Sequence, residues 1–125
     1  MMASELRVNT LKDGSGNNSI ALSSVATGTA KVTITFDGDS ATVRRSQNVS
    51  SLTDDATGRF SINQTSAFTD LHAIVVAGNG DHAVHNAGAN TNEVQTTSQY
   101  KHNHWENNAE VDCTDLNNAA FGDLA

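Results

Sequence analysis

Segments in which apolar and polar residues alternate recur along most of this chain, and turn-forming residues separate them. In the clearest segment, Val32, Ile34 and Phe36 alternate with polar residues. This period of two is typical of a β-strand with one buried face, and the Asp37-Gly38 pair that follows favours a turn. The pattern predicts an all-β protein, with an antiparallel, jelly-roll-like β-sandwich over residues 28–125.

The remaining strands are expected at similar spacing, which gives roughly six to eight strands in total. The apolar run at 71–77, which contains His72, is expected to form a strand covered on both faces, with His72 at an interior or interface position. Cys113 is expected to be a small, buried apolar residue. Further strands are predicted at 41–49, at 59–65, within 93–105, at 109–113 and at 117–121, with loops at 50–58 and 78–92.

The first 27 residues differ from the rest, and we expect them to lie outside the sandwich as an extended attachment or stalk segment. Leu6 and Val8 alternate with polar residues, as in a short strand, and the Gly- and Asn-rich residues 12–19 favour a turn. Residues 23–30 are small and polar, which predicts a linker. The expected organisation is a segment at 1–27 followed by one domain at 28–125.

Composition and charge argue against several classes of protein. The chain has 7 basic and 14 acidic residues, so it cannot build the large basic face on which nucleic-acid binding depends. No apolar run approaches the ~20 residues of a membrane span, and we expect neither membrane insertion nor a secretory signal. The single cysteine cannot form an internal disulfide, which fits synthesis in a reducing host cytoplasm.

Four segments carry a resemblance to a known group of proteins. They are SELRVNTLKDGSGNNS at 4–19, NVSSLTD at 48–54, GRFSINQT at 58–65 and DLNNAAFG at 115–122. Together they resemble small tail-fibre and virion-surface proteins of tailed bacteriophages from aquatic bacteria. The resemblance implies a structural protein of the virion surface, usually a homotrimer, whose N-terminal segment docks onto other virion proteins and whose sandwich points outward.

The physical composition is compatible with such an assembly. Leu, Ile, Val and Phe supply only 25 of the 125 residues, which is little for the core of a small monomer. A chain of this kind often gains its remaining stability from association. Three copies would bury Leu6, Val8, Leu11 and Ile20 around a shared axis, which one extended segment cannot do.

The function expected from these observations is that of a short trimeric tail fibre, which projects the sandwich for adhesion to polysaccharide on the host surface. The main alternative is a capsid-surface head fibre or decoration protein, which has the same architecture but another docking site, and whose main task is particle stability or weak adhesion. A small glycan-active enzyme would need paired carboxylates, for which the predicted outer loops offer Asp81 and Glu106. We expect no enzyme activity, and a free-living lectin is a further alternative.

The most specific local pattern is His102-x-His104. Residues i and i+2 of a strand share a face, so two imidazoles there could bind a divalent metal. In a trimer, three such pairs on the axis would offer six nitrogens, and some phage fibre and spike tips resemble this, with iron held by His-x-His. The alternative is a solvated or stacking pair beside Trp105. A second cluster, Asp81-His82 with His85, is either an exposed loop or a metal or carboxylate–histidine pair.

Tyr100 and Trp105 lie close together in the sequence among polar residues. An exposed aromatic ring can pack on the apolar face of a sugar while neighbouring polar groups bind its hydroxyls. The two aromatic residues are therefore candidate contacts for a glycan receptor. The alternative is that Trp105 fills the core of the sandwich or the interface of the trimer.

Overall fold

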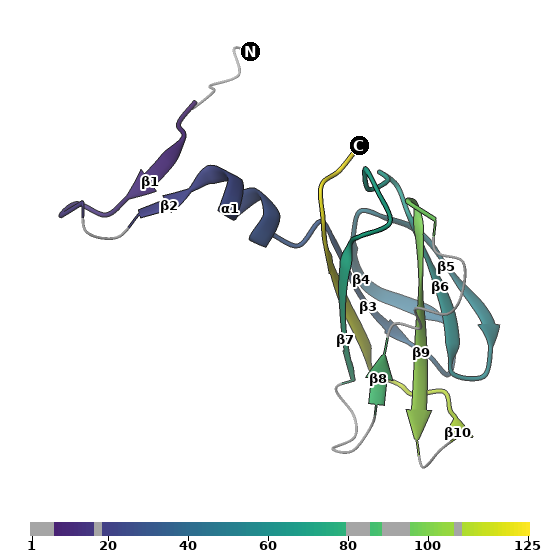
Figure 1. Ribbon diagram of the computed structural model, residues 1–125. Coiled ribbons are helices and arrows are strands. Elements are labelled where there is room, and N and C mark those ends of the chain that lie inside the picture. Colours follow the sequence, from purple (N-terminus) through teal and green to yellow (C-terminus); the bar gives the residue numbers. More distant parts are fainter. Residues whose placement is uncertain (1–6, 17–18, 80–85, 89–95, 107–108) are drawn as a thin grey trace, which may run out of the picture.

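The computed structural model describes residues 7–16, 19–79, 86–88, 96–106 and 109–125, which form an N-terminal arm and two packed sheets (Figure 1). The arm, residues 7–31, contains β1 (Thr10–Lys12), β2 (Ser19–Ala21) and α1 (Leu22–Gly28). β1 and β2 pair as a small antiparallel hairpin, and α1 follows β2 directly. Figure 1 shows this arm extending away from the sheets, which begin at Val32.

Nine further strands within the described residues form the two sheets, and all their pairings are antiparallel. The four-stranded sheet has the order β4 (Thr42–Gln47), β3 (Val32–Asp37), β11 (Leu116–Phe121) and β7 (Ile74–Asn79). The five-stranded sheet contains β10 (Ala109–Glu110), β9 (Gln99–Glu106), β6 (Arg59–Gln64), β5 (Val49–Ala56) and, on β9, β8 (Asn86–Gly88). The prediction of an antiparallel all-β fold is confirmed.

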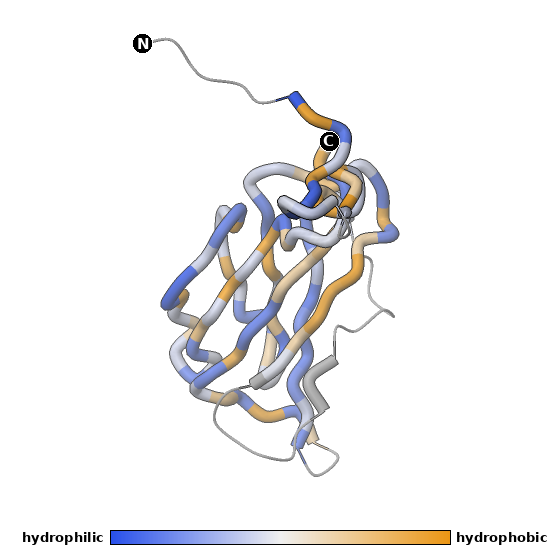
Figure 2. The backbone as a smooth tube through the Cα atoms, turned by 90° about the vertical axis from the view of Figure 1, so that its left-hand side faces the viewer, coloured by the Kyte–Doolittle hydropathy of each residue, from blue (hydrophilic) through white to orange (hydrophobic). Residues whose placement is uncertain are grey.

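The core lies between the two sheets and is built by the alternation along their central strands (Figure 2). Val32, Ile34 and Phe36 of β3 are at most 2% exposed and face Phe60 and Ile62 of β6. The rings of Phe36 and Phe60 meet edge to face, with their centroids 5.0 Å apart. Each of these side chains contributes about 1.5–3 kcal/mol to folding by its burial, so this layer fixes the relative position of the sheets.

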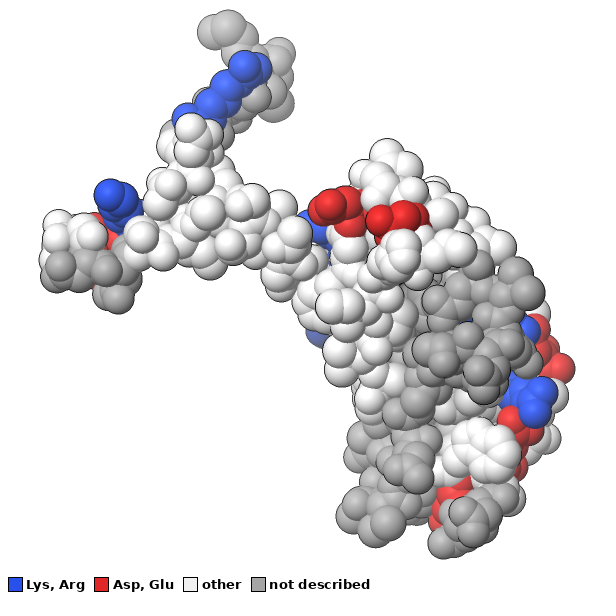
Figure 3. Space-filling model, viewed as in Figure 1, with Lys and Arg blue, Asp and Glu red and all other residues white. Residues whose placement is uncertain are grey.

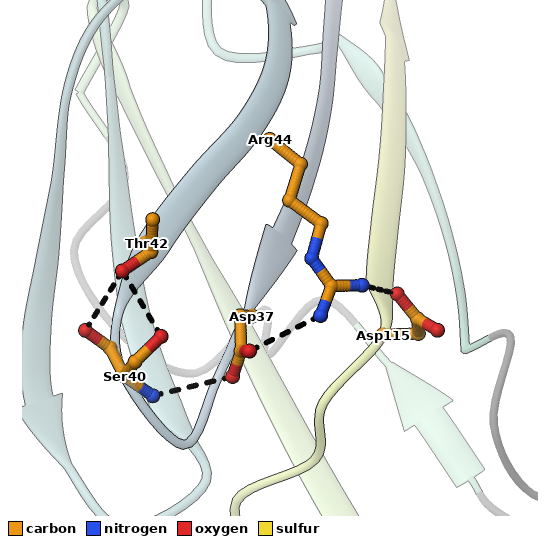
Figure 4. Close-up of polar contacts among 5 residues, drawn as sticks. All are labelled: Asp37, Ser40, Thr42, Arg44 and Asp115. Carbon is orange, nitrogen blue, oxygen red and sulfur yellow. Dashed lines mark hydrogen bonds and ion pairs between the residues drawn. The ribbon is translucent and has the colours of Figure 1, made fainter.

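The predicted turn after β3 is confirmed, and a cluster of polar contacts holds it in place (Figure 4). The Arg44 guanidinium on β4 pairs with Asp37 at the end of β3, at 3.1 Å, and with Asp115 just before β11. The other carboxylate oxygen of Asp37 accepts a hydrogen bond from the backbone N–H of Ser40. Arg44 thus links three neighbouring strands at one end of the four-stranded sheet.

The predicted loop at 50–58 is wrong, because most of this segment is strand β5. β5 is an edge strand whose side chains are mostly exposed, with Leu52 packed against the core, so it shows little apolar alternation. The chain passes from β4 to β5 at Asn48, which has a positive φ of 56°. The Asn48 side chain exchanges two hydrogen bonds with the backbone of Ser66, at 2.7 and 3.0 Å, and this stabilises the turn.

The prediction that 71–77 forms a strand covered on both faces is also wrong. Leu71 and His72 precede β7, and His72 is exposed, with its backbone N–H bonded to Asp70. Ile74 and Val76 on β7 are 66% and 56% exposed, whereas Val75 packs against the core. β7 is the last strand of its sheet and contributes only one face to the interior. The prediction of a buried Cys113 is confirmed.

The linker predicted at 23–30 is mostly helix α1. Leu22 and Val25, three residues apart, share one helical face, and the Lys31 ammonium donates a hydrogen bond to the carbonyl oxygen of Ala26 near the C-terminal end. None of the seven helical residues is buried. Within the described part of the chain, no helix has the length and apolar character needed to cross a membrane.

Candidate functional site

A polar surface with one exposed aromatic ring lies on the outer side of the five-stranded sheet. Trp105 and Asn103 are two residues apart on β9 and therefore point to the same side, opposite to the buried His102 and His104. Strand register places Glu110 of β10 opposite Trp105 and Arg59 of β6 opposite Asn103. We call these four residues the Trp105 face.

The side chains of the Trp105 face differ strongly in exposure. Trp105 is 41% exposed, whereas Asn103 is 4% exposed, and the side-chain oxygen of Asn103 has no hydrogen-bond partner among the described residues. The Arg59 Nε atom lies 2.5 Å from Glu110 Oε1 in an ion pair whose side chains are 40% and 20% exposed. A large ring, a guanidinium and a carboxylate thus meet solvent side by side.

A second ion pair continues this polar surface toward β5. The carboxylate of Asp55 accepts a hydrogen bond from the Ser61 hydroxyl at 2.5 Å and lies 3.6 Å from the ammonium of Lys101. The right-hand edge of the sandwich in Figure 3 shows such basic and acidic groups next to one another. Since the charges are paired, this surface can offer hydrogen bonds without a strong field of one sign.

The two candidate metal ligands, His102 and His104, share one face of β9, as predicted, but that face points into the core. They are 0% and 1% exposed. His102 Nδ1 lies 2.9 Å from the side-chain oxygen of Asn118, and its ring packs against Phe36 with a centroid distance of 5.8 Å. His104 Nδ1 donates to the carbonyl oxygen of Val111 at 2.8 Å.

This burial corrects the predicted geometry of a metal on a trimer axis. Both imidazoles lie inside one chain, not on a surface where three copies would meet. Within the residues that the structure describes, no group of three His, Cys, Asp or Glu side chains is arranged to hold a metal. Burial, together with the neighbouring His104, lowers the pKa of His102, although the hydrogen bond to Asn118 opposes this shift.

The predicted pair of glycan contacts is separated by the structure. Tyr100 is 2% exposed and belongs to the core, where burial raises its pKa, so its prediction as a surface contact is wrong. Trp105 is exposed, and the alternative that it fills the core is excluded. Glu110, opposite Trp105, and its ion-pair partner Arg59, opposite Asn103, were not predicted, because strand register alone brings them together and no local sequence motif marks them.

The four-stranded sheet has a shallow hollow of about 440 Å³ on its outer side. Small residues form its floor, and Val76 and Arg45 stand at its sides. This hollow was not predicted from the sequence either. The hollow arises from short side chains, including Thr35 and Ala119, that become neighbours only in the folded sheet.

The residues predicted for attachment lie in the arm. Leu11 and Ile20 face each other across the β1–β2 hairpin and are 43% and 46% exposed. Val8 is half-buried, and Leu6 lies outside the described residues. Asp81, His82 and His85 also lie outside the described residues, whereas Glu106 ends β9 and is half-buried.

Comparisons with models of known protein families, with curated proteins and with solved structures give no match to this chain.

Proposed function

We propose that this chain is a structural protein of a bacteriophage virion surface: a short trimeric tail fibre with a jelly-roll-like sandwich. Its N-terminal arm attaches to other virion proteins, and its sandwich projects outward for adhesion to polysaccharide on the host. One observation carries this proposal above the others. The described residues of the arm expose apolar side chains, and none of these residues is buried.

The arm is too small to be stable without a partner. Its hairpin has strands of three residues each, and its helix has seven residues, none of them buried. An isolated two-stranded hairpin is marginal in water, and isolated helices shorter than ~12–15 residues are marginal as well. A segment of this kind gains stability when it docks on another surface, which is the property expected of an attachment segment.

Association of three copies gives the arm its first partner. The Leu11–Ile20 pair lies on one side of the hairpin, where it can pack against the same pair from other copies. Residues 1–31 carry three basic and two acidic side chains, a net charge of +1, so this segment adds little repulsion to an assembly of chains whose net charge is −7. We therefore expect the arms to form the central contact of the trimer.

Native mass spectrometry tests the assembly. We expect a species near three times 13.1 kDa and its loss in the double variant Leu11→Ser, Ile20→Ser. The matched control is Val43→Ser, which removes an apolar side chain of similar exposure, 39%, from β4. A folded wild-type monomer would contradict the trimer.

Immunogold labelling of intact particles tests the location. Gold at the tail supports the tail fibre, and gold over the head shell assigns the chain instead to the capsid-surface alternative. Particles that carry no label, although the antibody recognises the purified protein, would refute a virion-surface role.

A further inference from the structure

We propose that the Trp105 face binds an uncharged hexopyranose unit of a polysaccharide. This inference names the ligand of the proposed adhesive function and rests on that function. It starts from the single tryptophan of the chain, which is 41% exposed on an otherwise polar sheet surface. Exposure of this much aromatic surface to water is unfavourable. A ligand with an apolar side would cover the indole ring and remove that surface from water.

The polar groups near the Trp105 ring can bind the hydroxyls of a sugar. One side of a pyranose ring consists of C–H groups, and its rim carries hydroxyls that both donate and accept hydrogen bonds. Glu110 lies directly opposite Trp105 in the strand register, which corresponds to roughly 4.5–5.5 Å between Cβ atoms. Arg59 is held beside Glu110 by the 2.5 Å contact, so an acceptor lies opposite Trp105 and a donor is paired with it.

The charge balance selects an uncharged sugar over an acidic one. Arg59 is paired with Glu110, and Lys101 is paired with Asp55, so the charges of this surface cancel in pairs. A sugar carboxylate would have to compete with Glu110 for Arg59 and would lie close to a like charge. A neutral hydroxyl can bind both partners without breaking the pair.

The position of the Trp105 face in the fold also suits adhesion. Trp105 is the penultimate residue of β9, and Glu110 lies on β10. Figure 1 shows the end of β9 and the adjacent β10 at the opposite end of the sandwich from its junction with α1. A chain attached through its arm would therefore present this surface away from the particle.

NMR spectroscopy of the full chain tests the inference with four probes, the methyl glycosides of glucose, galactose, mannose and N-acetylglucosamine. Because the chain has one tryptophan, the single indole N–H resonance reports on this site alone. We expect at least one glycoside to shift that resonance with a saturable, millimolar dependence. We also expect the affinity to change less than twofold between low and high salt, since the ligand is uncharged.

Saturation-transfer experiments on the same sugar measure binding in variants that lack the indole. Trp105→Ala should abolish the transfer and Glu110→Gln should weaken binding several-fold, while Arg45→Ala, which removes an arginine from the other sheet, should leave binding unchanged. If none of the four glycosides moves the indole resonance, or if Trp105→Ala still binds, the proposal is overturned. Native mass spectrometry and immunogold labelling report on the fibre function separately, so the two can fail independently.

Discussion

Acidification should destabilise this protein through His102. The imidazole is fully buried beside Phe36 and Phe60, with Nδ1 bonded to Asn118. Burial and the nearby His104 lower the pKa of His102 below its ordinary value of 6.5 in the folded state. The unfolded chain therefore takes up a proton at a higher pH than the folded chain does.

The sign and size of the effect follow from this difference. The stabilisation is fully present above pH 6.5, the ordinary value, and is lost as the pH falls from there toward the lower pKa of the folded state. Each pH unit in this window costs up to about 1.4 kcal/mol for one group. Between about pH 7.5 and about pH 5 the loss is therefore at most ~2 kcal/mol.

Urea unfolding monitored by circular dichroism at several pH values measures this loss. The variant His102→Gln cannot take up the proton, so its free energy of unfolding should fall less steeply between about pH 6.5 and about pH 5. His72→Gln is the matched control, because it makes the same substitution at a side chain that is 90% exposed and lies outside the core. Carboxylates titrate in all three proteins and cancel in the comparison. Equal slopes in the wild type and in His102→Gln would refute the reasoning.

Three further predictions concern the fold. Phe36→Ala, which removes a fully buried ring from the contact with Phe60, should lower the free energy of unfolding by about 3–5 kcal/mol in urea titrations, whereas a loss below ~1 kcal/mol would show that the site collapses around the change. Gly58→Ala should destabilise severely, because φ is +67° and the new Cβ would lie 2.6 Å from the carbonyl oxygen of His104; a wild-type thermal midpoint would contradict this. Arg44→Ala should cost no more than about 1 kcal/mol despite its two ion pairs, since the side chain is 42% exposed, and a larger loss in urea would show a more tightly coupled network.

The strands whose buried residues the sequence predicted correctly are β3 and β6, in which large apolar residues recur with a period of two. Val32, Ile34 and Phe36 on β3 and Phe60 and Ile62 on β6 are buried where the alternation places them. Their pattern is visible because each strand must contribute large apolar residues to the layer between the sheets.

The elements that were missed contribute little to that layer. β5 packs only two partly buried side chains, Val49 and Leu52, against the core, and α1 has no buried residue, so neither carries a pattern that distinguishes it from a loop or linker. For β7 the prediction was wrong in the opposite direction, because the continuous apolar run at 71–77 indicated burial on both faces of the strand. In the structure Ile74 and Val76 remain exposed, because what covers an edge strand depends on tertiary arrangement or on assembly.

The candidate site was predictable only in part. On one continuous strand, Tyr100 and Trp105 are five positions apart and must point to opposite sides, so they could not both have been surface contacts. The same parity places Tyr100, His102 and His104 together. Which of the two sides faces the core is decided by the partner strands, and no spacing along the chain indicates that Glu110 lies opposite Trp105 or that Arg59 lies opposite Asn103.

The scarcity of large apolar residues connects the composition to the buried histidines. With few Leu, Ile, Val and Phe available, the interior beside β9 and β11 is completed by His102, His104 and Asn118. Hydrogen bonds at 2.8 and 2.9 Å offset part of the cost of burying these imidazoles. His102 Nε2 has no partner among the described residues, and an unsatisfied buried polar atom costs about 1–3 kcal/mol. The folded state therefore depends on a neutral imidazole at His102, and this dependence is the physical origin of its expected sensitivity to acid.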